Sequence, residues 1–540
     1  MMLKLQVNSM KQHSDAFEKA GVSLPRYDIN GMREKTKREP IWVHFGAGNI
    51  FRSFIAALVQ DSLNEGLTDK GIIAAESFDF GIVDAIYKPH DNLSLLVKMH
   101  ANGVFEKELI GSVAESVTTN YANQKDWTRL QQVFCEASLQ LASFTITEKG
   151  YALRDMTGEY FPMVLQDIEN GPAAPRHTMS IVTTLAYARF KMGELPLAFV
   201  SMDNCSQNGK RLQDAVLTIA REWCERGFVE KRFLSYLTNP RKISFPWTMI
   251  DKITPHPAES VQMTLNRLGF MDMDIVVTGA KTFIAPFVNA EANGYLIVED
   301  NFPAGHMPIA TPNVHFTDRS TVEKTEKMKV CTCLNPIHTA LALYGCLLGY
   351  AFIWEAVLDQ DLQKLLERLV FTEGMPVVTD PGIISPLAFA REVMEERFPN
   401  PNIPDTPQRI ATDTSQKIGI RFGETLKLYQ AKESRPEGGF VCIPLVIATW
   451  FRYLLGVDDK GDAIALSPDP MMQELRDSVS SIFFGKPESY RGQLQPVLKN
   501  EALFHVDLEE IGLSERIEKM FVEMLVGPGS VRSTLQKYIV

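Results

Sequence analysis

The chain has 540 residues, of which 45% are hydrophobic and 22% charged, and its 55 basic and 66 acidic residues give a formal net charge of −11. This length is more than one hydrophobic core supports and predicts about two to four domains. The negative charge excludes the positive field that non-specific binding to nucleic acid or to an anionic membrane requires, so we expect neither partner.

The first half of the chain alternates short apolar runs with helical patterns. Strands are predicted over 40–48, 71–77, 141–151 and 194–204. Between the first two strands, residues 49–66 carry apolar side chains at helical spacing. Strands separated by helices indicate βαβ units, and therefore a parallel sheet.

Beyond residue 300 a segment rich in proline leads into mainly helical patterns, which cover 336–370, 387–397, 407–432, 440–456 and 509–525. We therefore predict an α/β domain with a parallel-rich sheet over 1–318, including an N-terminal extension, and a mostly α-helical domain over 319–540. All of the chain should fold except about the first dozen residues. The longest apolar run, 339–354, has 16 residues, short of the ~20 that cross a bilayer, and is predicted to be a buried core helix.

The N-terminal sequence shows no apolar region before a small-residue cleavage site, which predicts a cytoplasmic protein. The whole chain has seven cysteines, an odd number, and they are scattered along it, so we predict that they are reduced and structural. Cys331 and Cys333, followed by His338, raise the alternative of a zinc site. Their spacing is tighter than in usual zinc motifs and no second ligand pair is near, so no metal is expected.

The stretch "HFGAGNIFR" places Gly46 and Gly48 at the end of a strand and before a helix. In that context the first glycine makes a tight turn, and the second lets the backbone approach a pyrophosphate at the helix N-terminus, as in Rossmann-type domains. Phe51 stands where the usual third glycine would be, so a plain glycine turn remains the alternative. Glu76, with Asp79 in reserve, would bind the adenine ribose and favour NAD over NADP. The predicted cofactor-binding residues are Phe45, Gly46, Gly48, Asn49, Ile50, Phe51, Arg52 and Glu76.

Three further stretches place polar residues where a plain core would not have them. They are 201–209, which contains Asn204, 245–257, which contains Asp251, and the stretch around Asn335-Pro336. Asn335 with Pro336 is typical of a helix start, with the asparagine as N-cap. Under the functional alternative, Lys329, Asn335 and His338 face one cleft near the domain junction. Local chemistry leaves both alternatives open.

Seven stretches together match one family in chain order, from residue 45 to residue 417. They are "FGAGNIFR", "TITEKGY", "SMDNCSQNGK", "MIDKITP", "VEDNFPAG", "KVCTCLNPIHTALA" and "RFPNPNIPDTPQRIATDTSQK". The chain thus resembles the polyol-specific long-chain dehydrogenases, the mannitol dehydrogenase family. The resemblance implies an N-terminal Rossmann-type domain that binds NAD, a helical C-terminal domain and metal-independent catalysis.

The resemblance also implies roles for individual residues. A lysine acts as general acid/base in a Lys-x₄-Asn-x₂-His pattern, which Asn335 and His338 match. Lys329 lies six positions before Asn335 instead of five, so a one-residue bulge would be needed to bring it to the site, and Lys327 is the alternative. Asn204 matches a second asparagine that polarises the substrate carbonyl. The implied substrate-binding residues are Asp251, Arg409, Lys417 and Glu148.

The N-terminal segment, the "CTCLNP" variant and the length resemble the fructuronate reductase branch of this family. The expected activity is therefore NAD-dependent reduction of D-fructuronate to D-mannonate by a monomer or small homo-oligomer. Mannitol 2-dehydrogenase or tagaturonate reductase activity is the alternative within the family, so the substrate is a sugar acid or a polyol. A dinucleotide-binding sensor without catalysis is the alternative of a different class.

Overall fold

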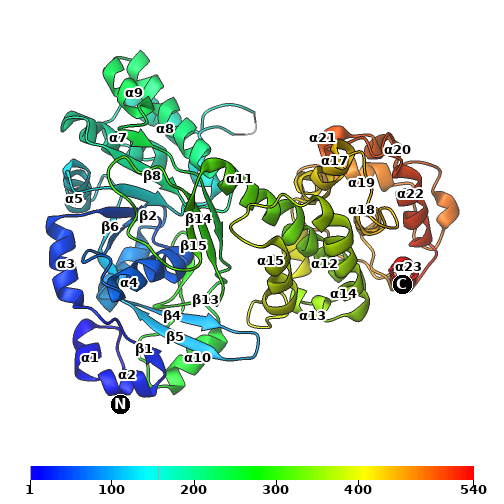
Figure 1. Cartoon of the computed structure of the whole chain (residues 1–540), viewed down its shortest axis with the longest axis horizontal. Helices are drawn as coiled ribbons and strands as arrows, with labels where there is room; N and C mark the ends of the chain where they lie inside the picture. The colour runs from blue at the N-terminus through cyan, green and yellow to red at the C-terminus, as the bar shows by residue number, and fades with distance from the viewer. Residues whose placement is uncertain (1, 156, 540) are drawn as a thin grey trace. The chain divides into compact units, whose positions relative to one another are not determined.

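The computed structural model describes residues 2–155 and 157–539. The chain divides into two compact units, Met1–Glu323 and Lys324–Val540, and helix α11 (Arg319–Met328) contains the boundary (Figure 1).

A six-stranded sheet with the order β6-β3-β2-β7-β8-β9 forms the centre of the first unit. Every neighbouring pair in it is parallel. This is the doubly wound order of dinucleotide-binding domains, in which the strand order reverses beside the first strand, here between β2 and β7. The strands are β2 (Trp42–Phe45), β3 (Ile72–Glu76), β6 (Val113–Thr118), β7 (Leu141–Phe144), β8 (Leu197–Ser201) and β9 (Ile243–Ser244).

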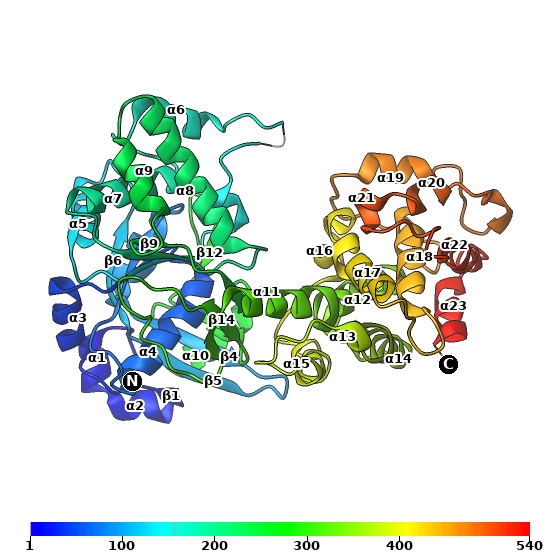
Figure 2. The same cartoon turned by 45° about the horizontal axis from the view of Figure 1, so that its top comes forward.

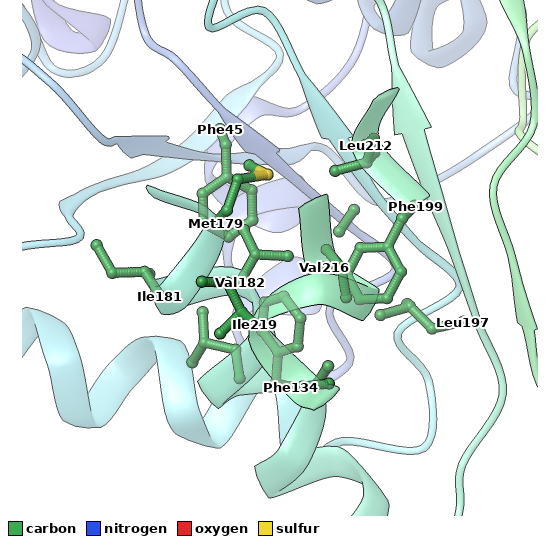
Figure 3. Close-up of a cluster of buried hydrophobic side chains, with 14 of the residues drawn as sticks. Phe45, Phe134, Met179, Ile181, Val182, Leu197, Phe199, Leu212, Val216 and Ile219 are labelled. Carbon is green, nitrogen blue, oxygen red and sulfur yellow. The ribbon is translucent and has the colours of Figure 1, made fainter. Parts of the chain in front are cut away.

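One face of this sheet packs on a large apolar core (Figure 3). Phe45 and Phe199 extend from the strands, and they meet Phe134, Val182 and Ile219 from three helices. Burial of each such side chain contributes about 1.5–3 kcal/mol, so this layer holds the sheet rigid beneath the loops at its carboxyl edge. The three helices are α5 (Gln124–Cys135), α7 (Thr178–Lys191) and α8 (Asn208–Glu225).

Smaller sheets complete the first unit, with the orders β1-β5-β4-β13, β10-β14-β15 and β11-β12. Their strands are β1 (Val22–Ser23), β4 (Ser94–Met99), β5 (Phe105–Ile110), β10 (Thr248–Asp251), β11 (Val276–Val277), β12 (Phe283–Ile284), β13 (Phe287–Glu291), β14 (Tyr295–Glu299) and β15 (Val314–Thr317). The remaining helices are α1 (Val7–Gln12), α2 (Ser14–Lys19), α3 (Ile29–Arg38), α4 (Ala56–Asn64), α6 (Pro162–Asn170), α9 (Lys231–Thr238) and α10 (Glu259–Arg267).

The prediction that the first dozen residues do not fold was wrong. The backbone N–H of Leu3 donates to the carbonyl of Gly269 at 2.8 Å, and the N–H of Met271 donates to the carbonyl of Leu3 at 2.8 Å. Leu3 and Leu5 are buried. These long-range contacts, which no local pattern reveals, hold the N-terminal extension on the first unit.

The described part of the second unit consists of helices joined by loops and contains no β-strand (Figure 2). The pattern predicted over 336–370 holds three helices, because Gly349 at φ +80° ends the first of them in a left-handed C-cap. The fold class is confirmed: a Rossmann-type parallel sheet is followed by helices. The main helices are α12 (Asn335–Leu348), α13 (Ile353–Val357), α14 (Gln360–Glu367), α15 (Pro386–Glu392), α16 (Pro407–Ala411), α17 (Glu424–Ala431), α18 (Cys442–Leu454), α19 (Met472–Val479), α20 (Gln495–Leu498), α21 (Glu501–Phe504), α22 (Ser514–Glu523) and α23 (Ser530–Tyr538).

One helical stretch of the described chain, Arg319–Leu348, is long and apolar enough to cross a membrane. Within the structure, 83% of its apolar window is buried. Helix α12 carries most of this apolar run and packs as a core helix, as predicted, although it ends at Leu348.

Candidate functional site

The glycine turn follows β2, at the point where the strand order of the large sheet reverses. Gly46 has φ +98°, and a Cβ added there would lie 2.2 Å from the carbonyl oxygen of Thr145, which follows β7. A Cβ added at Gly48 would meet no atom within 4 Å. Position 46 therefore requires glycine, because the chain ends of β2 and β7 approach too closely there for any side chain. The second glycine leaves the backbone open to a ligand.

Glu76 at the end of β3 is only 4% exposed. One of its oxygens accepts the N–H of Ala47 in the glycine turn at 2.7 Å. The other accepts the N–H groups of Ser77, Phe78 and Asp79 at 2.8–3.0 Å. Both oxygens thus already bind the backbone, so in this structure Glu76 ties the glycine turn to the loop after β3. The predicted ribose contact of Glu76 stays a prediction.

The reserve candidate, Asp79, is also buried and accepts a hydrogen bond from the Thr278 hydroxyl.

The other predicted cofactor residues fall into two groups. Gly48, Asn49 and Ile50 are partly exposed, whereas Phe45, Phe51 and Arg52 are buried. The Arg52 guanidinium donates to the carbonyl of Ala285 at 2.7 Å and to Oδ1 of Asn49 at 2.8 Å. Phe51, Arg52 and the next three residues form a π-helical turn. The buried side chains therefore shape the turn, and the exposed residues are the ones a cofactor can reach.

A buried polar network lies beneath the glycine turn. The ring of His44 lies 2.6 Å from Oγ of Ser143 and 2.8 Å from Oγ1 of Thr145, and it stacks on Phe51. Trp42 Nε1 donates to the same Ser143 hydroxyl at 2.7 Å. Burial lowers the pKa of His44 from 6.5 to about 3, so the ring is neutral.

This lowered pKa predicts acid sensitivity. Between pH ~6.5 and ~3 the unfolded chain protonates His44 and the folded chain does not, so stability is lost as pH falls, by about 1.4 kcal/mol per pH unit. The His44→Asn variant should lack this part of the slope, although it should be less stable than the wild type at pH 7. Urea unfolding at pH 7 and pH 5.5 measures both slopes. Equal slopes in wild type and variant would contradict the assignment.

Asp203, two residues after the end of β8, organises the loop that follows β7. Its carboxylate accepts the N–H groups of Ile146 and Thr147 at 2.9 Å and the Tyr151 hydroxyl at 2.6 Å. The neighbouring Asn204 is exposed. Glu148 in the same loop is exposed and forms an ion pair with Arg211 at 3.0 Å. The structure therefore brings the loops of Asn204 and Glu148 together at the carboxyl edge of the sheet.

Asp251 ends β10, one strand of a smaller sheet, and is 5% exposed. The next residue, Lys252, donates from Nζ to the backbone carbonyls of Glu291 and Asn293 at 2.7 and 2.9 Å. Of these two charged residues, Lys252 thus has a structural role.

In the second unit, Lys329 begins a π-helical turn, Lys329–Cys333. The N–H of Leu334 donates to the carbonyl of Lys329 at 3.1 Å, a bond that spans five residues instead of four. Such a turn accommodates one extra residue within a helix and is frequent at functional sites. It supplies the one-residue bulge that the spacing between Lys329 and Asn335 requires. Lys329 itself is 2% exposed.

A helix does start at Asn335, but of the two alternatives for this residue the capping one does not hold, because the N-cap is Leu334. The helical stretch begins at Arg319, and Leu334, which precedes α12, has a non-helical backbone conformation. Asn335 is the first residue of α12, and no side chain caps the start of this helix. The π-helical turn carries the helix through to this point, so the amide of Asn335 is not occupied in capping.

His338 lies in a strongly cationic environment. Its pKa is held well below 6.5 by burial first, and then by Arg421, Arg409, Lys417 and Arg397. Nε2 is buried, lies 3.8 Å from Oδ2 of Asp405, and has no hydrogen-bond partner among the described residues. His338 is therefore neutral, and four cations of the second unit lie near enough to lower its pKa.

Arg409 and Lys417, the predicted substrate-binding pair, already have protein partners. Arg409 is mostly exposed and forms an ion pair with Asp405. Lys417 donates from Nζ to the carbonyl of Thr412 at 2.5 Å. The structure does bring Arg409 and Lys417 near His338. The sequence could not reveal this, because both residues lie more than about 70 positions after His338.

Cys331 and Cys333 pack in the core of the second unit. Burial raises the pKa of both thiols to about 12, and Sγ of Cys333 donates to the carbonyl of Pro386 at 3.5 Å. Protonated thiols are poor metal ligands. No cluster of three or more His, Cys, Asp or Glu side chains suited to a metal ion occurs in residues 2–155 and 157–539.

Two family models match almost the whole chain. The mannitol dehydrogenase Rossmann domain matches residues 40–310, and the mannitol dehydrogenase C-terminal domain matches residues 321–525. The chain belongs to the mannitol dehydrogenase family. The predicted family is thereby confirmed, and with it the class of oxidoreductase.

Individual relatives of this family cover the chain from end to end. The chain is 50% identical over 539 residues to D-mannonate oxidoreductase of Thermotoga maritima, covering 99% of both chains. It is 28% identical to mannitol 2-dehydrogenase of Emericella nidulans, covering 96% of both.

Solved structures show the same fold at low identity. A substrate-free D-sorbitol dehydrogenase has a TM-score of 0.79 at 22% identity, covering 99% of this chain and 100% of its own. Mannitol 2-dehydrogenase of Pseudomonas fluorescens, solved with NAD and D-mannitol, has a TM-score of 0.71 at 22% identity over 99% of both chains.

Sequence reasoning gave no role to four residues that shape these sites. Asp203 and Tyr151 hold the loop after β7, and Arg397 and Arg421 add charge beside His338. Asp203 and Tyr151 stand inside quoted motifs, so their signal was available. Arg421 stands four residues after Lys417, and no local pattern distinguishes it from a surface arginine.

Proposed function

We propose that this chain catalyses the reversible, NAD-dependent reduction of D-fructuronate to D-mannonate. The observation that carries the proposal is the group of cations near neutral His338: Arg421 donates to the next residue, Thr339, Arg409 pairs with Asp405, which lies 3.8 Å from the ring, and the charges of Lys417 and Arg397 also lower the pKa of His338. A polyol brings no charge to compensate such a cluster, whereas a sugar acid brings a carboxylate. The 50% identity to a D-mannonate oxidoreductase supports the same substrate class.

The glycine turn fits the pyrophosphate of NAD. Gly46 turns the chain at φ +98°, a Cβ at Gly48 would occupy otherwise open space, and the helical residues begin at Asn49. Backbone N–H groups at a helix N-terminus favour an anion. When bound there, NADH supplies the hydride that the ketone carbon accepts.

We assign the remaining steps to residues of both units, following the family pattern. Asn204 and Asn335 donate hydrogen bonds to the carbonyl oxygen, where negative charge develops, and such donors are each worth ~3 kcal/mol of barrier. Lys329 as ammonium donates a proton to that oxygen, and as free amine it takes the proton in the oxidative direction. Neutral His338 orients the substrate, Asp251 and Glu148 contact it, and no step needs a metal ion.

A panel of four ketoses tests the substrate. Purified protein is given NADH with D-fructuronate, D-tagaturonate, D-fructose or D-fructose 6-phosphate, and the loss of absorbance at ~340 nm is followed. We expect kcat/KM for fructuronate to exceed that for fructose by at least about 100-fold, because one charged hydrogen bond contributes about 1.5–3 kcal/mol. Preference for fructose would overturn the sugar-acid assignment. No turnover of any ketose would favour the dinucleotide-binding sensor.

A further inference from the structure

Arg421 is a cation of the second unit that has no acidic partner within residues 2–155 and 157–539. It lies in a π-helical turn, Gly419–Gly423, and donates from Nη1 to the Thr339 hydroxyl at 2.5 Å. Desolvation lowers its pKa to about 10, and no carboxylate among the described residues counters that effect. A guanidinium has five N–H donors, so most of the donors of Arg421 are not used by the protein.

Two fully buried arginines show how this chain satisfies a guanidinium by itself. Arg189 donates to the backbone carbonyls of Phe134, Glu136, Leu139 and Pro196. Arg452 donates to the carbonyls of Met524, Val457 and Asp458. Both are structural residues whose donors are distributed over backbone acceptors. Arg421, with one hydroxyl partner, does not follow this pattern.

Arg421 is tied to the helical turn that bears Asn335 and His338. The Thr339 hydroxyl that accepts from Arg421 donates in turn to the backbone carbonyl of Asn335 at 3.0 Å. Arg421 is also the charge that acts most strongly on His338, whose Nε2 is buried without a hydrogen-bond partner among the described residues. The unused N–H donors of Arg421 and the unpaired ring nitrogen of His338 therefore lie in the same part of the second unit.

The neighbouring cations have less to offer a ligand. Arg409 is paired with Asp405, and Lys417 donates to the carbonyl of Thr412. Of these three cations, Arg421 is the guanidinium that has no carboxylate partner among the described residues, so it suits bidentate binding of a carboxylate that enters the cluster.

We propose that Arg421 receives the carboxylate of the substrate and thereby selects sugar acids over polyols. This assignment rests on the proposed function, since it names the residue that recognises the acid group. Fructose carries a hydroxymethyl group where fructuronate carries the carboxylate. A comparison of these two ketoses therefore isolates the interaction between the carboxylate and Arg421.

The test compares kcat/KM for fructuronate and fructose in the wild type, Arg421→Met, Arg421→Lys and the control Arg435→Met. Arg435 is exposed and donates only to the carbonyl of Ile511 at 3.3 Å. We expect Arg421→Met to lose about 100-fold with fructuronate and less than about threefold with fructose. Arg421→Lys should recover part of the loss, and Arg435→Met should match the wild type. Calorimetric titration with D-mannonate should show the same order of affinities without turnover.

The outcomes separate this assignment from the proposed function. Equal losses with both ketoses, or no loss with fructuronate, would overturn the role of Arg421. Should the wild type ignore fructuronate but reduce tagaturonate, the proposed function fails, and the role of Arg421 is upheld if Arg421→Met loses tagaturonate activity selectively. Wild-type activity confined to uncharged ketoses would overturn both.

Discussion

Replacement of Lys329 with alanine is expected to lower kcat by about 10²- to 10⁴-fold, the usual contribution of a positioned general acid or base. NADH affinity should change less than about twofold, because the proposed cofactor residues all lie in the first unit. Stopped-flow measurement of NADH oxidation, with a separate fluorescence titration of NADH, distinguishes the two effects.

The matched control is Lys327→Ala, which removes the other lysine that the spacing allows. Lys327 ends helix α11 ahead of the π-helical turn, whereas Lys329 begins the turn. If Lys327→Ala abolishes turnover and Lys329→Ala does not, the general acid/base is Lys327. A further variant that deletes Thr332 tests the turn itself. It should restore an ordinary helical register, turn Lys329 by about 100° relative to Asn335, and abolish turnover.

Replacement of Gly46 with alanine is expected to lower the free energy of unfolding by about 3 kcal/mol or more. The new Cβ would lie 2.2 Å from the Thr145 carbonyl oxygen at a φ of +98°. Backbone atoms of two strand ends would have to move apart, and L-residues avoid this conformation. Urea unfolding followed by tryptophan fluorescence measures the loss.

Gly48→Ala supplies the matched control for this prediction. A Cβ there meets no atom within 4 Å, so the free energy of unfolding should stay within about 0.5 kcal/mol of wild type. NADH affinity should nevertheless fall about tenfold or more, because the methyl group occupies the space through which the pyrophosphate approaches the backbone. A stable Gly46→Ala variant, or unchanged NADH binding by Gly48→Ala, would contradict the roles given to these glycines.

Much of the fold followed from local patterns. The strands predicted over 40–48 and 71–77 are β2 and β3, with bounds a few residues shorter. The helical pattern over 336–370 was less well predicted, because hydrophobic periodicity continues across Gly349 although the helix does not. The folding of the first dozen residues could not be predicted, since it depends on a pairing between Leu3 and residues near 270.

For the candidate site, the sequence by itself singled out the residues to which we assign the chemistry: Gly46 and Gly48, Asn204, Lys329, Asn335 and His338 stand in motifs whose order is specific. Only the tertiary structure decided what the surrounding charges do. It assigned both oxygens of Glu76 to backbone N–H groups, gave Lys329 a π-helical turn, and brought Arg421 to His338 from 83 residues away in the chain. The physical reason is that residue type and spacing set local backbone conformation, whereas desolvation and charge compensation depend on neighbours that are distant in sequence.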